Sequence, residues 1–209
     1  RPISLISNLA KLFERIINNK LAAHLNQFIH PEQHGFVKNK STISALSSIV
    51  DSAIQHKQHD KTAIIAIDIA SAFDKAWWPA IIYELDKANI PSDLIKIMMS
   101  YLSDRSILFD YGDYSSSKTL SCGCPQGGVL SPLLWTILLN DLLVTLNISD
   151  SKVVAFADDI TIVCWASSVN LLKEKIIASI NFVDKWCQSR KLSINNNKTN
   201  ILYLFKKNK

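Results

Sequence analysis

The chain has 209 residues, which is enough for one substantial domain or two small ones. Its 48% hydrophobic and 20% charged residues are typical of a folded globular chain and exclude an intrinsically disordered one. The net charge of +5 is compatible with a polyanionic partner, and no apolar stretch is long enough to predict a membrane-spanning helix.

The N-terminal third begins with two predicted helices. Residues 7–28 are expected to form the first, because apolar side chains recur three or four positions apart. A polar, basic loop follows at 31–41, and the same apolar spacing predicts a second helix at 43–54. The run 62–69 is short and rich in β-branched residues, which is typical of a buried strand.

Three more helices are predicted after this strand, at 79–90, 92–102 and 131–146. Pro79 and Pro132 each fit the first position of a helix, and Ser131 fits the N-cap. Between the last two helices, the spacing of turn residues predicts a weak hairpin at 106–120 and a glycine-rich loop at 123–128.

A second hairpin is predicted near the C-terminal end. Two apolar runs, 153–157 and 160–165, are separated only by Asp158 and Asp159, so both aspartates are expected at the tip of a tight turn. The remaining predicted elements are a helix at 168–189, a polar loop at 195–198 and a strand at 200–205. This succession of elements indicates a mixed α+β fold.

Three aspartates stand where a charge is costly. Asp68 lies inside the apolar strand 62–69, and an ionised carboxylate there must be paired or bind a metal. A turn explains one aspartate more easily than the adjacent pair Asp158 and Asp159. Oxygen ligands without histidine or cysteine favour Mg²⁺ or Mn²⁺. On the residues alone, a metal site and a purely structural role are equally open.

Six motifs resemble, in their order and spacing, those of reverse transcriptases, most of all those of non-LTR (LINE-type) retrotransposons. They are RPISLISNLAKLFERI, QHGF, IDIASAFDKAWW, GCPQGGVLSPLLW, FADD and LSINNNKT. The resemblance covers nearly the whole chain. It implies an RNA-directed DNA polymerase core with a right-hand palm, in which helices cover one face of an antiparallel sheet, and fingers-type helices and a hairpin. The thumb is expected to be absent.

The same resemblance implies a division of the chain into two parts of one partial reverse-transcriptase domain. Residues 1–60 are expected to form a fingers-type segment, and residues 61–209 a palm-type domain with a return to the fingers at about 85–120. The family's metal site implies two ions, Mg²⁺ or Mn²⁺, held by Asp68, Asp158 and Asp159 and by the backbone carbonyl of Ile69.

Substrate contacts are implied for five further residues. Phe73 would lie beneath the incoming sugar and exclude a ribose 2′-hydroxyl, and Gln126 would lie near the nascent base pair. Gly127 and Gly128 would let the backbone approach the substrate, and Lys198 would protonate the departing pyrophosphate. On the residues alone, the alternatives are a core position for Phe73, an ordinary turn for the glycines and a solvated side chain for Lys198.

One position departs from the family pattern. Arginine usually follows the GF of the QHGF motif, and this chain has Val37. Lys38 or Lys40 could supply the missing charge to a triphosphate, although lysine lacks the bidentate geometry of arginine. A solvated basic loop is the equal alternative.

The expected partners are an RNA template, a DNA primer and dNTPs, with no membrane. The four cysteines are too few for a disulfide scaffold, which predicts reduced thiols in an intracellular protein, nuclear or cytoplasmic. Two alternatives to an active retrotransposon enzyme remain: a decayed or repurposed element that binds nucleic acid without polymerising, and a mobile-intron reverse transcriptase. An RNA-dependent RNA polymerase shares the chemistry, but Phe73 argues against ribonucleotide use.

Overall fold

A computed structural model of the chain describes residues 3–25, 27–57, 61–146 and 148–204. These residues form two compact units, one from residues 1–28 and 73–138, the other from 29–72 and 139–209. The boundaries differ from the predicted division at residue 60, because the segment from residue 29 belongs with the sheet. The assignment of the units to fingers and palm stays a prediction.

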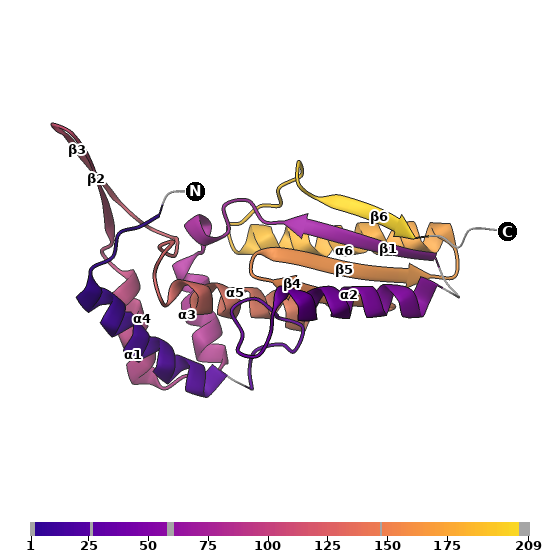
Figure 1. Cartoon of the computed structure of the whole chain (residues 1–209), viewed down its shortest axis with the longest axis horizontal. Coiled ribbons are helices and arrows are strands. Elements are labelled where there is room, and N and C mark those ends of the chain that lie inside the picture. Colours follow the sequence, from indigo (N-terminus) through magenta and orange to yellow (C-terminus); the bar gives the residue numbers. More distant parts are fainter. Residues whose placement is uncertain (1–2, 26, 58–60, 147, 205–209) are drawn as a thin grey trace. The chain divides into compact units, whose positions relative to one another are not determined.

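The second unit is built on a four-stranded sheet in the order β4-β5-β1-β6 (Figure 1). The strands are β1 (Lys61–Asp68), β4 (Ser151–Phe156), β5 (Asp159–Ala166) and β6 (Asn200–Leu204). Every neighbouring pair is antiparallel. The predicted strand 200–205 is confirmed as far as Leu204, and Phe205 lies outside the described residues.

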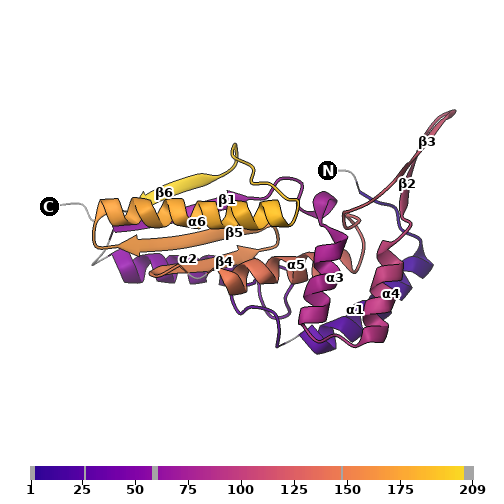
Figure 2. The ribbon, with the colours of Figure 1, turned by 180° about the vertical axis from the view of Figure 1, so that it is seen from behind.

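One face of this sheet carries the core of the unit. Alternate residues of β1, including Ile65 and Ile67, are buried and lie opposite buried residues of β5. Helix α6 (Val169–Ser189) covers this face, as the 3.5 Å contact between Cys164 of β5 and Ser179 of α6 shows. Figure 2 shows α6 running along the sheet.

Helix α2 (Thr42–Lys57) lies on the other face. Its His56 ring stacks on Trp165, with ring centroids 3.6 Å apart. Trp165 follows Cys164 directly in β5, and successive side chains of a strand point to opposite faces. We expected the helices on one face of the sheet, and α2 adds partial cover to the other.

The first unit is mainly helical. Its elements are α1 (Asn8–Leu25), the short 3-10 helix η1 (Phe73–Lys75), α3 (Trp78–Lys87), α4 (Ser92–Leu102) and a ribbon of β2 (Ser106–Tyr111) and β3 (Tyr114–Thr119). Helices α3 and α4 pack on each other, whereas every residue of the ribbon is exposed. The ribbon confirms the predicted hairpin.

Helix α5 (Ser131–Thr145) contributes to both units, which divide after Leu138. It is apolar on all sides and almost wholly buried, as expected of a core helix. Its C-terminal half is joined to α6 by Asp141, which accepts hydrogen bonds from Trp186 Nε1 at 3.0 Å and from Arg190 at 2.7 Å. Within the described residues, no helix is long and apolar enough to cross a membrane.

Candidate active site

Two of the three predicted aspartates meet where β1 ends and β5 begins. Asp68 and Asp159 are direct partners across these antiparallel strands. Residues that lie directly opposite each other in a sheet project to the same face, so both carboxylates lie on one face. Asp68 is partly buried and Asp159 is exposed. The fold therefore brings together acidic residues that are distant in the sequence.

The hairpin turn lies one residue earlier than predicted. Ala157 and Asp158 form the turn, whereas Asp159 is the first residue of β5 and pairs with both Phe156 and Asp68. The prediction that Asp159 occupies the tip is therefore wrong. The physical reason is that pairing on both sides keeps Asp159 in the sheet, while Ala157 adopts the left-handed backbone conformation of a tight turn, with a φ of 57°.

The polar loop between α6 and β6 holds Asp68 in position. Asn195 donates its side-chain amide to Asp68 Oδ2 and its backbone N–H to the Asp68 carbonyl, both at 2.8 Å. Lys198 Nζ lies 3.9 Å from the same Oδ2, and its side chain is 64% exposed, so this ion pair is weak. Asn195 was not predicted. Its only signal was the run of asparagines in the LSINNNKT motif.

Ile69, the expected backbone ligand, follows Asp68 and forms an isolated antiparallel bridge with Ile194. Beside this bridge, the Ala70 N–H donates to the Ser193 carbonyl at 2.8 Å. The bridge ties the residues after β1 to the loop that orients Asp68.

The ligand chemistry of this face suits a hard divalent cation. Like charges directly opposite each other in a sheet are destabilising, so Asp68 and Asp159 favour a positive ion between them. Their oxygen ligands match Mg²⁺ or Mn²⁺. Across the described part of the chain, however, no three acidic, histidine or cysteine side chains form a group ready to hold a metal ion. Two carboxylates share a face, and Asp158 stands in the adjoining turn.

The basic loop at 31–41 is closed on itself. Lys40 donates its ammonium group to the Pro31 carbonyl, and its backbone N–H donates to the Val37 carbonyl at 3.2 Å. Lys38 is exposed. The two lysines that we expected near a triphosphate therefore differ, because Lys40 supports its own loop and Lys38 faces solvent.

Four of the residues predicted to contact substrate lie in the helical unit: Phe73, Gln126, Gly127 and Gly128. Phe73 opens η1 and stacks on Trp135, with centroids 5.6 Å apart and ring planes at 30°. Its carbonyl accepts a hydrogen bond from the Cys124 N–H at 2.7 Å. One residue on, Asp74 Oδ1 accepts a hydrogen bond from Gln126 Nε2 at 2.9 Å. The SAFD segment and the glycine-rich loop are thus tied together.

Two glycines of this loop are required by its geometry. Gly127 has a φ of 107°, which side chains rarely allow, and a Cβ there would lie 3.2 Å from the Ser4 carbonyl. A Cβ at Gly128 would lie 2.8 Å from Ser131 Oγ. The Ser4 N–H also donates to the Gln126 carbonyl at 2.9 Å. The N-terminal segment and the glycine loop are therefore packed backbone to backbone.

A buried carboxylate binds the backbone N–H groups just before α5. The hydroxyl of Ser131, the expected N-cap, donates to the Pro125 carbonyl at 2.7 Å. Glu14 of α1 instead accepts hydrogen bonds from the backbone N–H groups of Val129 and Leu130, and it is only 1% exposed. A negative charge at this end of a helix is stabilised by the helix dipole.

Replacing Glu14 with Ala is expected to destabilise the chain by about 3 kcal/mol, because buried donors lose their acceptor. One of these donors is the Tyr101 hydroxyl, 2.7 Å from Glu14 Oε1. Burial raises the pKa of Tyr101, and its hydrogen bond to Glu14 adds to the effect. Urea unfolding should give this variant a lower midpoint than the control Glu174→Ala, which changes an exposed glutamate of α6. Equal unfolding midpoints would show that Glu14 has no such role.

The four cysteines are free thiols. Burial raises the pKa of Cys124 and of Cys187 to about 12, and it also raises the pKa of Cys164. These three thiols therefore stay protonated near neutral pH.

The antiparallel sheet, with aspartates where a strand meets a hairpin, agrees with the right-hand polymerase palm that the motifs implied. Residues 1–208 match the family described as "Reverse transcriptase (RNA-dependent DNA polymerase)". The chain belongs to this family, as its motifs predicted.

Relatives of the chain come from mobile elements. The RNA-directed DNA polymerase from mobile element jockey of Drosophila melanogaster is 28% identical over 204 residues, which cover 93% of this chain and 22% of the relative. The Pol polyprotein from type-1 retrotransposable element R1 of Bradysia coprophila is 32% identical over 187 residues, which cover 89% of this chain and 18% of the relative. The chain thus spans about a fifth of the length of these curated relatives.

Solved structures confirm the fold. Apo telomerase from Candida tropicalis, truncated from its C-terminal domain, superimposes with a TM-score of 0.67 over 93% of this chain and 40% of that one, at 17% identity. Telomerase from the same organism in complex with a fragment of telomeric RNA gives a TM-score of 0.64 over 94% of this chain and 34% of that one, at 15% identity.

Proposed function

We propose that this chain is the catalytic core of an RNA-directed DNA polymerase of a non-LTR retrotransposon. It extends the 3′-hydroxyl of a DNA primer with dNTPs on an RNA template. The observation that carries the proposal is the cross-strand pair of Asp68 and Asp159, with Asp158 in the turn beside it. The polymerases named among its relatives support the same activity.

The residues that would hold two Mg²⁺ or Mn²⁺ ions are Asp68, Asp158 and Asp159, with the carbonyl of Ile69. Bound ions would activate the primer 3′-hydroxyl and stabilise the leaving pyrophosphate. Asn195 keeps the Asp68 carboxylate oriented through its 2.8 Å hydrogen bond. Lys198, exposed and beside Asp68, is the proton donor to the leaving pyrophosphate.

The residues of the helical unit select the nucleotide. Phe73 contacts the deoxyribose and excludes a 2′-hydroxyl, and Gln126 contacts the nascent base pair. Gly127 and Gly128 allow the backbone of their loop to approach the substrate. Lys38 is the better candidate of the two loop lysines for the triphosphate, because Lys40 is engaged by the Pro31 carbonyl.

The test is primer extension on a primed RNA template in the full-length protein. We expect Mg²⁺-dependent incorporation of dNTPs, and a loss of at least about a hundredfold in Asp158→Asn, because one metal ligand is removed. Asp150→Asn is the matched control. Asp150 lies just before β4 and pairs with Lys175 at 3.0 Å. Activity that survives Asp158→Asn, or a wild-type protein that incorporates nothing, would overturn the proposal.

A further inference from the structure

The QHGF segment is attached to the free edge of the sheet beside the hairpin. Strand β4 is an outer strand, and Gln33 forms a parallel bridge with its Ala155. The Ala155 N–H donates to the Glu32 carbonyl at 2.9 Å, and the His34 N–H donates to the Ala155 carbonyl at 2.7 Å. Residues 32–34 thus extend the sheet next to the strand that leads into the Asp158 turn.

The next residue contacts the turn itself. A Cβ added to Gly35 would lie 2.0 Å from the backbone nitrogen of Ala157 and 2.7 Å from its Cα. The Gly35 N–H donates to the side-chain carbonyl of Gln33 at 3.0 Å, and Gln33 is fully buried. The loop therefore lies directly against Ala157, whose positive φ starts the turn. A movement of the loop would therefore disturb the backbone of the residue before Asp158.

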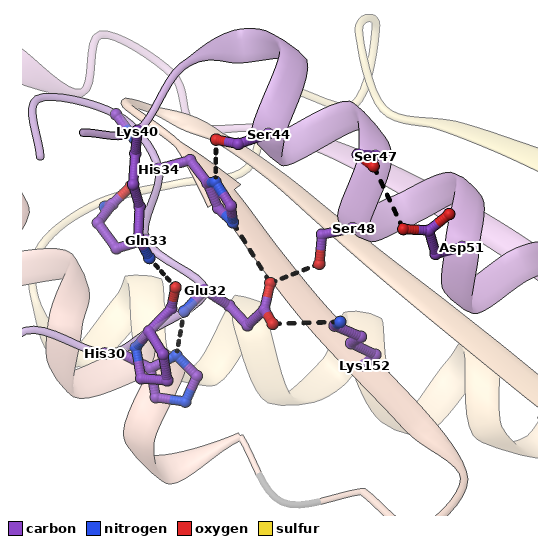
Figure 3. Close-up of polar contacts among 12 residues, drawn as sticks. His30, Glu32, Gln33, His34, Lys40, Ser44, Ser47, Ser48, Asp51 and Lys152 are labelled. Atoms are coloured by element: carbon purple, nitrogen blue, oxygen red, sulfur yellow. Dashed lines mark hydrogen bonds and ion pairs between the residues drawn. The ribbon is translucent and has the colours of Figure 1, made fainter.

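Glu32 is the side chain that fastens this loop (Figure 3). Its Oε2 accepts a hydrogen bond from Ser48 of α2 at 2.7 Å, and its Oε1 lies 3.1 Å from the ammonium group of Lys152 in β4. His34 Nε2 lies 3.4 Å from Oε2, and His34 Nδ1 is 2.7 Å from Ser44 of α2. One carboxylate thus connects the loop, a helix and the hairpin strand.

Opposing effects act on the ionisation of Glu32. Burial raises the pKa of its carboxyl, but the hydrogen bonds from Ser48, Lys152 and His34 and the charge of Lys152 outweigh burial, so the pKa lies below its ordinary value. The carboxylate form is therefore the one that this cluster stabilises.

We propose that Glu32 is a positioning residue for the polymerase: by fastening the QHGF loop to β4 and α2, it holds the turn that carries Asp158. The proposal rests on the proposed function, because the turn matters for catalysis only if Asp158 is a metal ligand. Glu32 itself touches neither aspartate. Its effect passes through the loop backbone, from Glu32 and His34 to Ala155, and from Gly35 to Ala157.

Two substitutions are expected to loosen this attachment to different degrees, and a third serves as the control. Glu32→Gln removes the charge that Lys152 pairs with, and Ser48→Ala removes a single hydrogen bond. Ser47→Ala changes the neighbouring serine, which is exposed and bonds only Asp51 of its own helix among the contacts in Figure 3.

The first measurement is amide hydrogen exchange of residues 155–159 in the full-length protein without metal or nucleic acid. We expect exchange to become about tenfold faster in Glu32→Gln and severalfold faster in Ser48→Ala, with no change in Ser47→Ala, because exchange reports local opening. A melting curve shows whether Glu32→Gln folds. If it does not fold, the exchange of Ser48→Ala tests the proposal. Unchanged exchange in Glu32→Gln and Ser48→Ala would overturn the proposal.

The second measurement is steady-state dNTP incorporation. We expect kcat to fall about tenfold in Glu32→Gln while KM for dNTP stays within about twofold, because the defect displaces a catalytic group and leaves nucleotide binding intact. Equal kcat in the variant and wild type would contradict a positioning role. If the wild type is inactive, the proposed function fails, and the exchange data still decide whether Glu32 holds the turn.

Discussion

Substituting Asp68 with Asn is expected to lower kcat for dNTP incorporation about a thousandfold and to raise the melting temperature in metal-free buffer. The loss of activity is expected because a bound metal stabilises the transition state by several kcal/mol, and the proposed metal site includes this carboxylate. The gain in stability follows because Asp68 directly faces Asp159, and an amide removes the repulsion between them. Asparagine also retains an oxygen that accepts the hydrogen bond of Asn195.

Primer extension and thermal melting with and without Mg²⁺ test both effects. Mg²⁺ should raise the melting temperature of the wild-type protein and change that of the variant much less. Asp150→Asn again provides the control, since it changes an exposed aspartate near the opposite end of β4. A variant with kcat within tenfold of wild type, or a melting temperature that falls in metal-free buffer, would refute the assignment of Asp68.

The second large effect is expected from Gly35→Ala, which should destabilise the chain by about 3 kcal/mol or more and abolish polymerisation. The added methyl would lie 2.0 Å from the Ala157 nitrogen, a distance that no rotamer can relieve. Either the loop leaves the edge of β4 or the turn moves. Either outcome disturbs the support of the turn that carries Asp158.

Gly112→Ala is the matched control for this substitution. Gly112 lies in the turn of the exposed β2–β3 ribbon, where a Cβ would meet nothing within 4 Å. Its φ of 56° is strained for alanine and costs about 1 kcal/mol. Since both changes are glycine to alanine, their effects on the unfolded chain are similar. If chemical unfolding showed the same loss of unfolding free energy in both variants, the proposed contact would be contradicted.

The elements themselves were largely predictable from local patterns. The predicted helices and strands were confirmed, because apolar spacing and proline positions act over a few neighbouring residues. The exceptions lie at element ends, where helix α1 ends at Leu25 rather than at residue 28. Domain division was harder: α2 follows α1 in sequence, yet it packs on β1, β4 and β5.

The sequence indicated which aspartates to consider for the candidate site. It did not indicate how they are arranged. An aspartate inside an apolar strand indicates a special role wherever that strand lies, and the motif order identifies which acids belong together. Which acid faces Asp68 depends on the register of β1 and β5, and the sequence placed Asp159 in the turn instead. A pattern of apolar runs does not show whether the strand pairing is shifted by one residue.

By itself, the sequence determined the family and the order of the elements, because these depend on ordered motifs and on local spacing. The metal role of the three aspartates stays a prediction. Only the tertiary structure decided the strand register and the hydrogen-bond partners of Glu14, Glu32 and Asn195. A buried or half-buried polar side chain takes its partners from segments far away in the chain. Those partners are known only once the backbone has folded around them.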